Sequence, residues 1–350
     1  MYEPKNSIKV LKETEKYLEE NLELENRLDE SKWIYHSIGM IIPQTFENLF
    51  SGHFFPYLES QQELQISFNL VCFGLYKQAF VSLRSALELG LLSVYYNIND
   101  DGHNTVKDWL SSKDSYDSNT PRAGKVWKIL LSNPNIKEFN DKHDLRKTFD
   151  ELGYLHNYVH TKGAKFSNRM GLLKGNSQTF ESNLIIKWLK SYEDVIFLIC
   201  ILHLLKYPLA VVRFDYSKKF GIDIPSFGGL QEYYIDKIAK MLPEGYLKDI
   251  EEIAKKDKQT QETIKEIKSF PDMTDEEVEN QALELEKMFI EDGEGFILWL
   301  ESQKNILKAV GETEFSDSMK MRIEILRSWA IENDFMNPKF ERLGIKIRKK

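Results

Sequence analysis

The sequence predicts an all-α protein: a helical bundle preceded by N-terminal helices and followed by an additional charged helical region. Apolar residues recur with helical spacing almost everywhere, and strand-like alternation is not evident. The chain is 42% hydrophobic and 29% charged, which is typical of a globular protein. Its 350 residues suffice for two domains, or for one domain with large additions. We expect a helical extension over 1–60, the bundle over 61–220 and an acidic helical region over 230–350.

The N-terminal region combines a charged segment with an aromatic one. Residues 5–29 alternate charge and leucine at helical spacing, which predicts an exposed amphipathic helix. Residues 31–58 are richer in aromatic side chains. Because proline interrupts a helix, we expect this helix to break near Pro43 or to end near Pro56.

Residues 61–98 carry the clearest core pattern. Two stripes repeat at i, i+4, i+7 and i+11: Leu64, Phe68, Val71 and Leu75, and then Ala79, Leu83, Ala86 and Gly90. The small residues of the second stripe would let another helix approach closely. The pattern predicts two packed helices joined near residues 74–78, or one long helix.

The middle of the chain alternates loops with helices. Residues 99–121 and 161–180 predict loops, and helices are expected at 123–132 and 144–160 with Pro134 between them. Asp144 is the expected N-cap of the second helix.

The most apolar helix is expected at residues 182–213, with a kink or break at Pro208. Its core, residues 195–205, is 11 residues long, and a membrane span needs roughly 20, so we expect a buried helix and no membrane association. Cys72 and Cys200 lie in apolar runs and predict buried thiols. The charged N-terminus does not resemble a signal peptide, and we expect a cytoplasmic protein.

Residues 221–229, GIDIPSFGG, predict a boundary, after which the helices become strongly charged. Thr274 and Glu277 form a capping-box pattern there. The helices that we expect beyond this boundary are 230–241, 244–268, 274–292, 294–309 and 316–333.

Charge is distributed unevenly along the chain. Residues 230–350 hold 27 acidic and 20 basic residues, so −7 of the net charge of −8 lies there. This acidity argues against general coating of nucleic acid, but it allows one local anion site. The segment 161–175 contains no acid and four cations, Lys162, Lys165, Arg169 and Lys174.

Arg84 and Glu88 are four residues apart in an otherwise apolar helix. Such a pair contributes only about 0.2–0.5 kcal/mol, which is small against the cost of burying both charges, so we expect a third partner. Two interpretations stay open: a structural pair completed by a tyrosine or a helix terminus, and a functional site.

His156 and His160 are also four residues apart, a spacing that can hold a metal ion between two imidazoles. A third ligand such as Glu88 would be needed, and Asn157 stands where a zincin motif has glutamate. Partly buried, hydrogen-bonded histidines are the commoner outcome, and we expect neither a metal nor a cofactor. The sequence contains no GxGxxG, P-loop or GxSxG motif.

A family resemblance covers about residues 61–213. Gly74-x-Tyr76-x-x-Ala79 and Arg84-x-x-x-Glu88, followed by a late helix ending in His, resemble an uncharacterised subgroup of the HEPN-like helical-bundle proteins of bacteria. The matching residues are Gly74, Ala79, Arg84, Glu88, Tyr154 and His160.

This resemblance implies a homodimer of a phage-defence or stress/toxin–antitoxin system that binds RNA or a nucleotide. Many HEPN proteins are metal-independent ribonucleases, whose arginine and histidine are separated by four to six residues on one helix. In this chain the corresponding positions before His160 are Gly153, Tyr154 and Leu155, so the arginine of that motif is absent.

Two functions follow as hypotheses. In the first, His160 is a general base on a 2′-hydroxyl, Arg84 stabilises the charge on the phosphate, and Glu88 orients one of them. The cations of segment 161–175 would hold the RNA backbone. In the second, the chain is a non-catalytic interaction protein, whose acidic C-terminal helices bind a protein partner.

Overall fold

The structure, a computed structural model, divides into two compact units by its internal contacts. It describes residues 4–42, 54–98, 104–112, 120–167, 178–221, 228–309 and 314–342. Over these ranges it contains helices and no strand, which confirms the all-α class. One unit comprises Met1–Arg213 and Pro225–Lys265, and the other comprises Phe214–Ile224 and Glu266–Lys350. The predicted boundary at 221–229 falls mostly on residues outside the described ranges.

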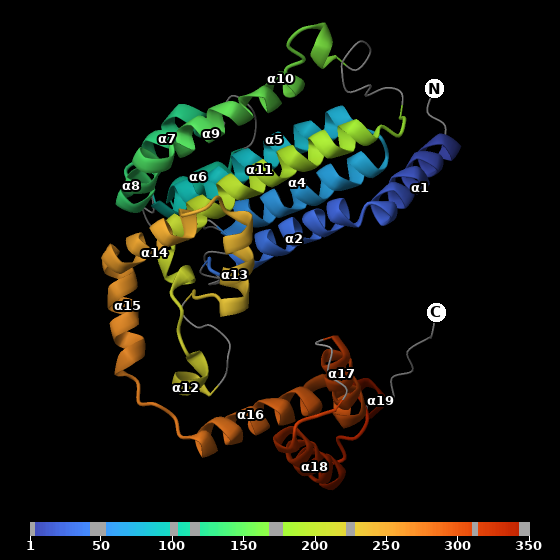
Figure 1. The fold of residues 1–350 in the computed structure, drawn as a ribbon, viewed down its shortest axis with the longest axis vertical. Helices are drawn as coiled ribbons and strands as arrows, with labels where there is room; N and C mark the ends of the chain where they lie inside the picture. Colours follow the sequence, from blue (N-terminus) through green and yellow to red (C-terminus); the bar gives the residue numbers. More distant parts are fainter. Residues whose placement is uncertain are drawn as a thin grey trace. The chain divides into compact units, whose positions relative to one another are not determined.

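The first unit is built on a bundle of long helices that lie side by side (Figure 1). After α1 (Pro4–Glu20), the bundle consists of α2 (Leu22–Gly39), α4 (Phe54–Cys72), α5 (Tyr76–Ile98) and α11 (Ser182–Lys206). The two-helix interpretation of residues 61–98 is therefore confirmed. Pro43 lies outside the described residues, and the expected end at Pro56 is wrong. Pro56 stands in the first turn of α4, where its missing N–H costs no intrahelical hydrogen bond.

Two glycines allow close approaches in this bundle. Gly74, between α4 and α5, has φ +70°, and a Cβ there would lie 2.8 Å from the Thr179 carbonyl oxygen. Gly90 on α5 faces α11, where a Cβ would lie 2.4 Å from Cδ1 of Ile199. The small-residue stripe therefore does what its pattern predicts at Gly90: it brings two helix backbones together.

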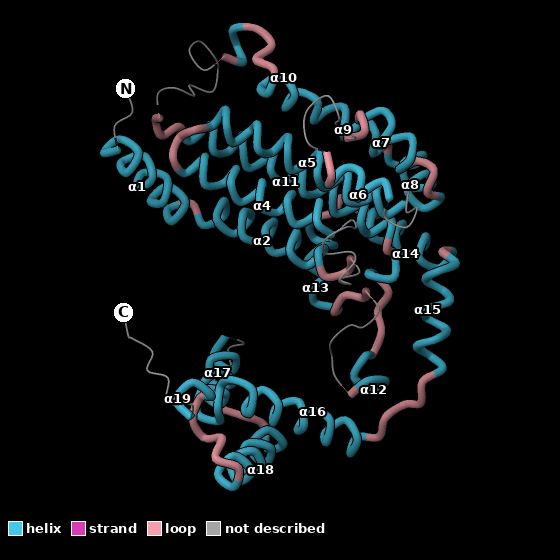
Figure 2. The backbone as a smooth tube through the Cα atoms, turned by 180° about the vertical axis from the view of Figure 1, so that it is seen from behind, coloured by secondary structure: helices cyan, strands magenta, loops and turns pink. Residues whose placement is uncertain are grey.

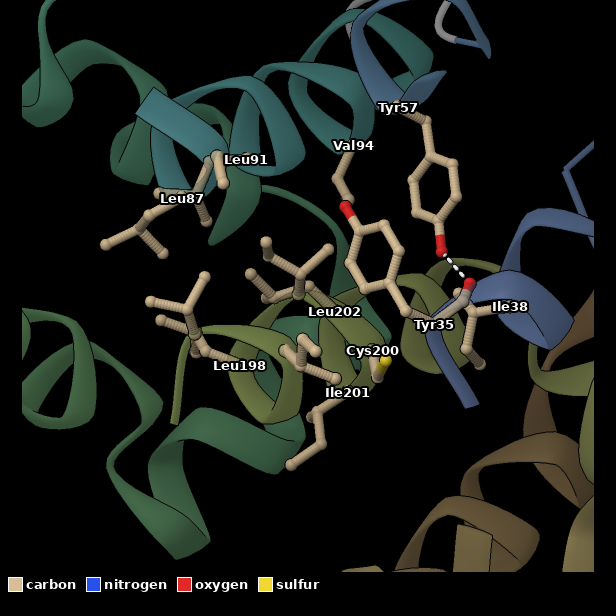
Figure 3. Close-up of a cluster of buried hydrophobic side chains, with 14 of the residues drawn as sticks. Tyr35, Ile38, Tyr57, Leu87, Leu91, Val94, Leu198, Cys200, Ile201 and Leu202 are labelled. Carbon is tan, nitrogen blue, oxygen red and sulfur yellow. Dashed lines mark hydrogen bonds between the residues drawn. The ribbon is translucent and has the colours of Figure 1, made fainter. Parts of the chain in front are cut away.

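The core between these helices contains a satisfied polar chain. Tyr35 and Tyr57 stack with ring centroids 4.6 Å apart, and the Tyr57 hydroxyl donates to the Tyr35 carbonyl (Figure 3). The Tyr35 hydroxyl donates to Ser60 Oγ at 2.7 Å, which donates to the Ala86 carbonyl at 2.6 Å. Each buried hydroxyl thus has an acceptor, which avoids the cost of an unpaired polar group. Cys200 is buried beside them, as expected, and burial raises the pKa of its thiol.

Short helices form a row along one side of the bundle, next to α5 (Figure 2). They are α7 (Ala123–Leu130), α8 (Pro134–His143), α9 (Leu145–Glu151) and α10 (Leu155–Val159), with α6 (Asn104–Leu110) preceding them in the chain. The expected break near Pro134 is present between α7 and α8, but the sequence pattern does not predict α8, whose first residue is Pro134. Asn133 caps that helix by accepting from the N–H groups of Asn135 and Ile136.

The expected continuous helix over 144–160 is also wrong. Asp144 is its N-cap, accepting from the Lys147 N–H, but the helix is interrupted by a 3₁₀ turn (η1, Leu152–Tyr154) before α10 begins. Gly153 lies in that turn, and glycine disfavours a regular helix by about 1 kcal/mol relative to alanine. His160 directly follows α10 as its C-cap residue.

The remaining helices of the first unit follow α11, which ends before the 3₁₀ turn η3 (Pro208–Val211), as the break at Pro208 predicts. They are α13 (Glu232–Met241), α14 (Tyr246–Lys256) and most of α15 (Lys258–Ser269). The single helix expected over 244–268 is wrong. Asp257 separates α14 from α15, because its carboxylate accepts from the Thr260 N–H at 2.8 Å and from Asn135 Nδ2 at 2.9 Å.

The second unit has its own small core. Its helices are α12 (Tyr216–Phe220), α16 (Asp275–Phe289), a π-helical turn η4 (Ile290–Glu294), α17 (Gly295–Ala309), α18 (Asp317–Glu332) and α19 (Lys339–Arg342). Ile290, Phe296, Trp299, Leu326 and Ala330 form that core. The capping box of Thr274 and Glu277 is confirmed, with both reciprocal hydrogen bonds present. Among the described residues, no helix combines the length and apolarity needed to cross a membrane.

Candidate functional site

The Arg84–Glu88 pair combines a buried cation with an exposed carboxylate. Arg84 is 8% exposed, and its Nη2 donates to Glu88 Oε1 at 2.5 Å, while the Glu88 side chain is 54% exposed. The Arg84 guanidinium carbon lies 5.7 Å from the centre of the Phe149 ring of α9. The third contact is thus an aromatic face, and not the tyrosine or helix terminus considered from the sequence.

The Nε of Arg84 has no hydrogen-bond partner among the described residues. A buried donor without an acceptor costs about 1–3 kcal/mol. The pair is therefore not arranged for maximal stability.

Two imidazoles face the same region from α10. The rings of His156 and His160 have centroids 4.2 Å apart. The pKa of His156 is lowered, first by burial and then by the nearby charges of His160, Lys162 and Arg84, while Glu88 opposes the shift. The side chains of His160, Lys162, Arg84 and Glu88 thus all lie close enough to His156 to shift its pKa. His156 is therefore neutral at neutral pH, the form that accepts a proton.

The structure places the expected cations of segment 161–175 unequally. Lys162 and Lys165 are exposed, and Lys162 contributes to the pKa of His156. Lys165 lies with its Nζ 4.9 Å from the ring centre of Phe166. Arg169 and Lys174 lie outside the described residues.

Sequence reasoning missed Lys77. This buried lysine of α5 donates from Nζ to Thr161 Oγ1 at 2.9 Å, which ties α5 to the residues after α10. A signal was present, because Lys77 precedes Arg84 by seven residues and so shares its helix face.

Arg84 and Glu88 also line a cleft of about 450 Å³ within the first unit. Most of its other walls are apolar, and they come from α5, α6, α9 and the start of α7: Leu89, Leu91, Leu92, Trp109, Pro121, Ala123, Val126 and Phe149. Arg122 adds a second cation. The sequence does not reveal this cleft, because its walls come from segments that are distant along the chain.

The metal-dependent alternative receives no support from the geometry. In the ranges that the structure describes, no group of three or more His, Cys, Asp or Glu side chains is arranged to hold a metal ion. The possible site formed by His156, His160 and Glu88 is therefore not assembled. The chemistry that the arrangement can supply is proton transfer by imidazole and charge stabilisation by guanidinium.

Comparison with protein-family models, with curated proteins and with solved structures found no match to this chain. Its function is therefore inferred from its own residues, of which the histidine pair and the Arg84–Glu88 pair are the chemically informative ones.

Proposed function

We propose that this chain is a HEPN-like, cytoplasmic protein of a bacterial phage-defence or stress/toxin system that binds RNA and cleaves it without a metal ion. The observation that carries the proposal is the pair of imidazoles, His156 and His160, 4.2 Å apart beside the charge of Arg84. Metal-independent RNA cleavage needs a proton acceptor, a proton donor and a cation near one phosphate. These three roles can be filled by side chains of α5 and α10.

The cleavage step assigns a role to each group. A neutral imidazole removes the proton of the ribose 2′-hydroxyl, whose oxygen then attacks the adjacent phosphorus. The bond from phosphorus to the 5′ oxygen breaks, and the second imidazole, which is protonated, donates its proton to that oxygen. The products are a 2′,3′-cyclic phosphate and a 5′-hydroxyl. The lowered pKa of His156 favours it as the base, a role that the sequence suggested for His160, and leaves His160 as the acid.

The charged residues complete this assignment. Arg84 would stabilise the negative charge that develops on the phosphate oxygens, and Glu88 would hold the guanidinium in place through its 2.5 Å hydrogen bond. Lys162 would contact the RNA backbone beside the histidines.

The test is incubation of the purified protein with a labelled single-stranded RNA in EDTA. We expect cleavage to a cyclic phosphate, with a loss of about 10²-fold or more in His156→Ala and His160→Ala. His36→Ala, which removes an exposed histidine of α2, is the matched control and should cleave normally. The DNA form of the oligonucleotide lacks the 2′-hydroxyl and should stay intact. Unchanged cleavage in both site variants would contradict the proposal.

Salt dependence tests the backbone contact separately. Removing one phosphate contact should make the slope of log affinity against log salt shallower by about 0.7 for a single strand. We expect this change in Lys162→Ala and none in Lys16→Ala, an exposed lysine of α1. Equal slopes in both variants would exclude Lys162 from the RNA contact.

A second function, protein interaction, is favoured by the surface of the second unit. It exposes several large apolar side chains, including Phe289 at 64% and Met321 at 70%. Apolar residues exposed in number mark interaction surfaces. Sedimentation of wild type and Phe289→Glu tests the expected homodimer. A wild-type dimer that dissociates in the variant would support a dimer interface at this surface. A wild type that is monomeric at all concentrations would contradict the homodimer, and the partner of this surface would then be a different protein.

A further inference from the structure

We propose that the cleft lined by Arg84 and Glu88 is a guanine-binding subsite, so that the substrate is RNA cut beside a guanosine. The inference rests on the proposed function because it takes RNA as the substrate. Its evidence is the cleft itself. The cleft belongs to the first unit, measures about 450 Å³, and combines one polar wall with mostly apolar ones.

The polar wall carries the Glu88 carboxylate, whose two oxygens are adjacent acceptors, beside the Arg84 guanidinium. Glu88 Oε1 accepts from Arg84 Nη2, and Oε2 has no partner among the described residues. A carboxylate oxygen accepts two hydrogen bonds, so both oxygens can take further donors. The guanidinium beside them supplies the donor. Arg84 is 92% buried and its Nη2 already donates to Glu88, so the two groups are joined before a ligand arrives.

Guanine is the base whose pairing edge is complementary to these groups. Its N2 amino group and N1–H are adjacent donors, and its O6 is the acceptor that follows them. Uracil presents a single donor between two acceptors, cytosine presents one donor followed by two acceptors, and adenine presents one donor and one acceptor. A site built to accept two hydrogen bonds discriminates strongly against a ligand that lacks one of them, because a polar group is then left unpaired.

The apolar walls suit a flat ring. Trp109 of α6 packs against the ring of Tyr96, at a centroid distance of 5.6 Å, and Phe149 of α9 also lines the cleft. Splayed-out bases of single-stranded RNA are recognised by stacking on such side chains, together with hydrogen bonds to their edges. Arg122 at the same cleft supplies a cation for an adjoining phosphate.

The cleft is coupled to the histidine pair through shared residues. Arg84 and Glu88 line the cleft, and both also act on the pKa of His156. Because α10 packs on α5, a guanine bound against this pair would lie beside the helix that carries His156.

The test is calorimetric titration of the full chain with GMP, IMP and AMP. IMP differs from GMP only by the missing 2-amino group. We expect GMP to bind about tenfold or more tightly than either of the others. Glu88→Gln, which replaces one acceptor by a donor, should remove that preference. Glu151→Gln, an exposed glutamate of α9, should retain it. Thermal unfolding of both variants checks that they are folded.

The outcomes separate this inference from the proposed function. Selective binding of GMP by a chain that cuts no RNA would support the subsite and overturn the ribonuclease. Cleavage without preference for guanosine, together with GMP binding no tighter than IMP or AMP, would overturn the subsite alone. A GMP preference that survives in Glu88→Gln would also overturn it.

Discussion

At the level of single residues, Arg84 combines burial with an incomplete set of hydrogen bonds. Its side chain is 10% exposed, its Nη2 is bound by Glu88, and its Nε has no acceptor among the described residues. A buried ion pair is weak evidence for stability, because desolvation offsets the attraction. The Arg84–Glu88 pair is thus not arranged to maximise stability, which is what a ligand-binding role for Arg84 would require.

Replacement of Arg84 by methionine tests this view. We expect Arg84→Met to change the free energy of unfolding by less than about 1 kcal/mol, because an apolar side chain of similar volume avoids the desolvation cost. Urea denaturation measures the change. The control is Arg27→Met, which removes two hydrogen bonds of 2.9 and 2.7 Å to Glu193 and should destabilise by about 1–3 kcal/mol. A loss above about 3 kcal/mol in Arg84→Met would identify a structural pair instead.

The lowered pKa of His156 predicts how the stability of the protein depends on pH. Its pKa is lowered by burial and by neighbouring cations, so the unfolded chain binds this proton at a higher pH than the folded one. The contribution of His156 to stability should therefore fall as the pH drops below its ordinary pKa of about 6.5. NMR titration should show His156 losing its proton below that value, and both Lys162→Ala and Arg84→Met should raise its pKa. Titration at or above the ordinary value would contradict the assigned charges.

At the level of elements, the contact between α5 and α11 depends on one glycine. In Gly90→Ala the new Cβ would lie 2.4 Å from Ile199, and we expect a loss of about 1–3 kcal/mol in the free energy of unfolding. Ile199→Ala in the same chain should recover part of that loss, which a double-mutant cycle measures. Gly124→Ala in α7 is the control, since a Cβ there meets nothing within 4 Å. Additive effects at Gly90 and Ile199 would show that the contact is not tight.

The break between α9 and α10 sets the direction of the histidine pair. A Cβ at Gly153 meets nothing within 4 Å, so Gly153→Ala should fold and gain up to about 1 kcal/mol in helix propensity. We expect RNA cleavage to fall while the melting temperature stays the same or rises, because a more regular helix turns His156 relative to α5. Cleavage at the wild-type rate would show that the turn has no positioning role.

At the level of the whole molecule, the described residues form two hydrophobic cores, one in each unit. Calorimetry should therefore resolve two unfolding transitions. Leu202→Ala, in the first core, and Leu326→Ala, in the second, should each cost about 2–5 kcal/mol and lower only the transition of its own unit. A single transition that both variants lower equally would mean that the units unfold together.

The sequence by itself determined the features that depend on near neighbours. Helical spacing predicted the all-α class and, as one of two interpretations, the two helices α4 and α5. Residue types predicted the break at Pro208, the Asp144 cap and the Thr274–Glu277 capping box. These features follow from contacts three or four residues apart, which a linear pattern records. The same local reasoning placed a break near Pro134 but missed α8, because proline can begin a helix as well as interrupt one.

Only the tertiary structure decided how the candidate site is assembled. Arg84 and the histidine pair were both visible in the sequence. The effect of Arg84 on the pKa of His156, however, requires α10 to pack on α5. The hydrogen bond between Lys77 and Thr161 and the cleft beside Glu88 join residues that are distant along the chain. The physical reason is that burial and electrostatic coupling depend on distance in space, whereas helical periodicity is a property of each segment alone.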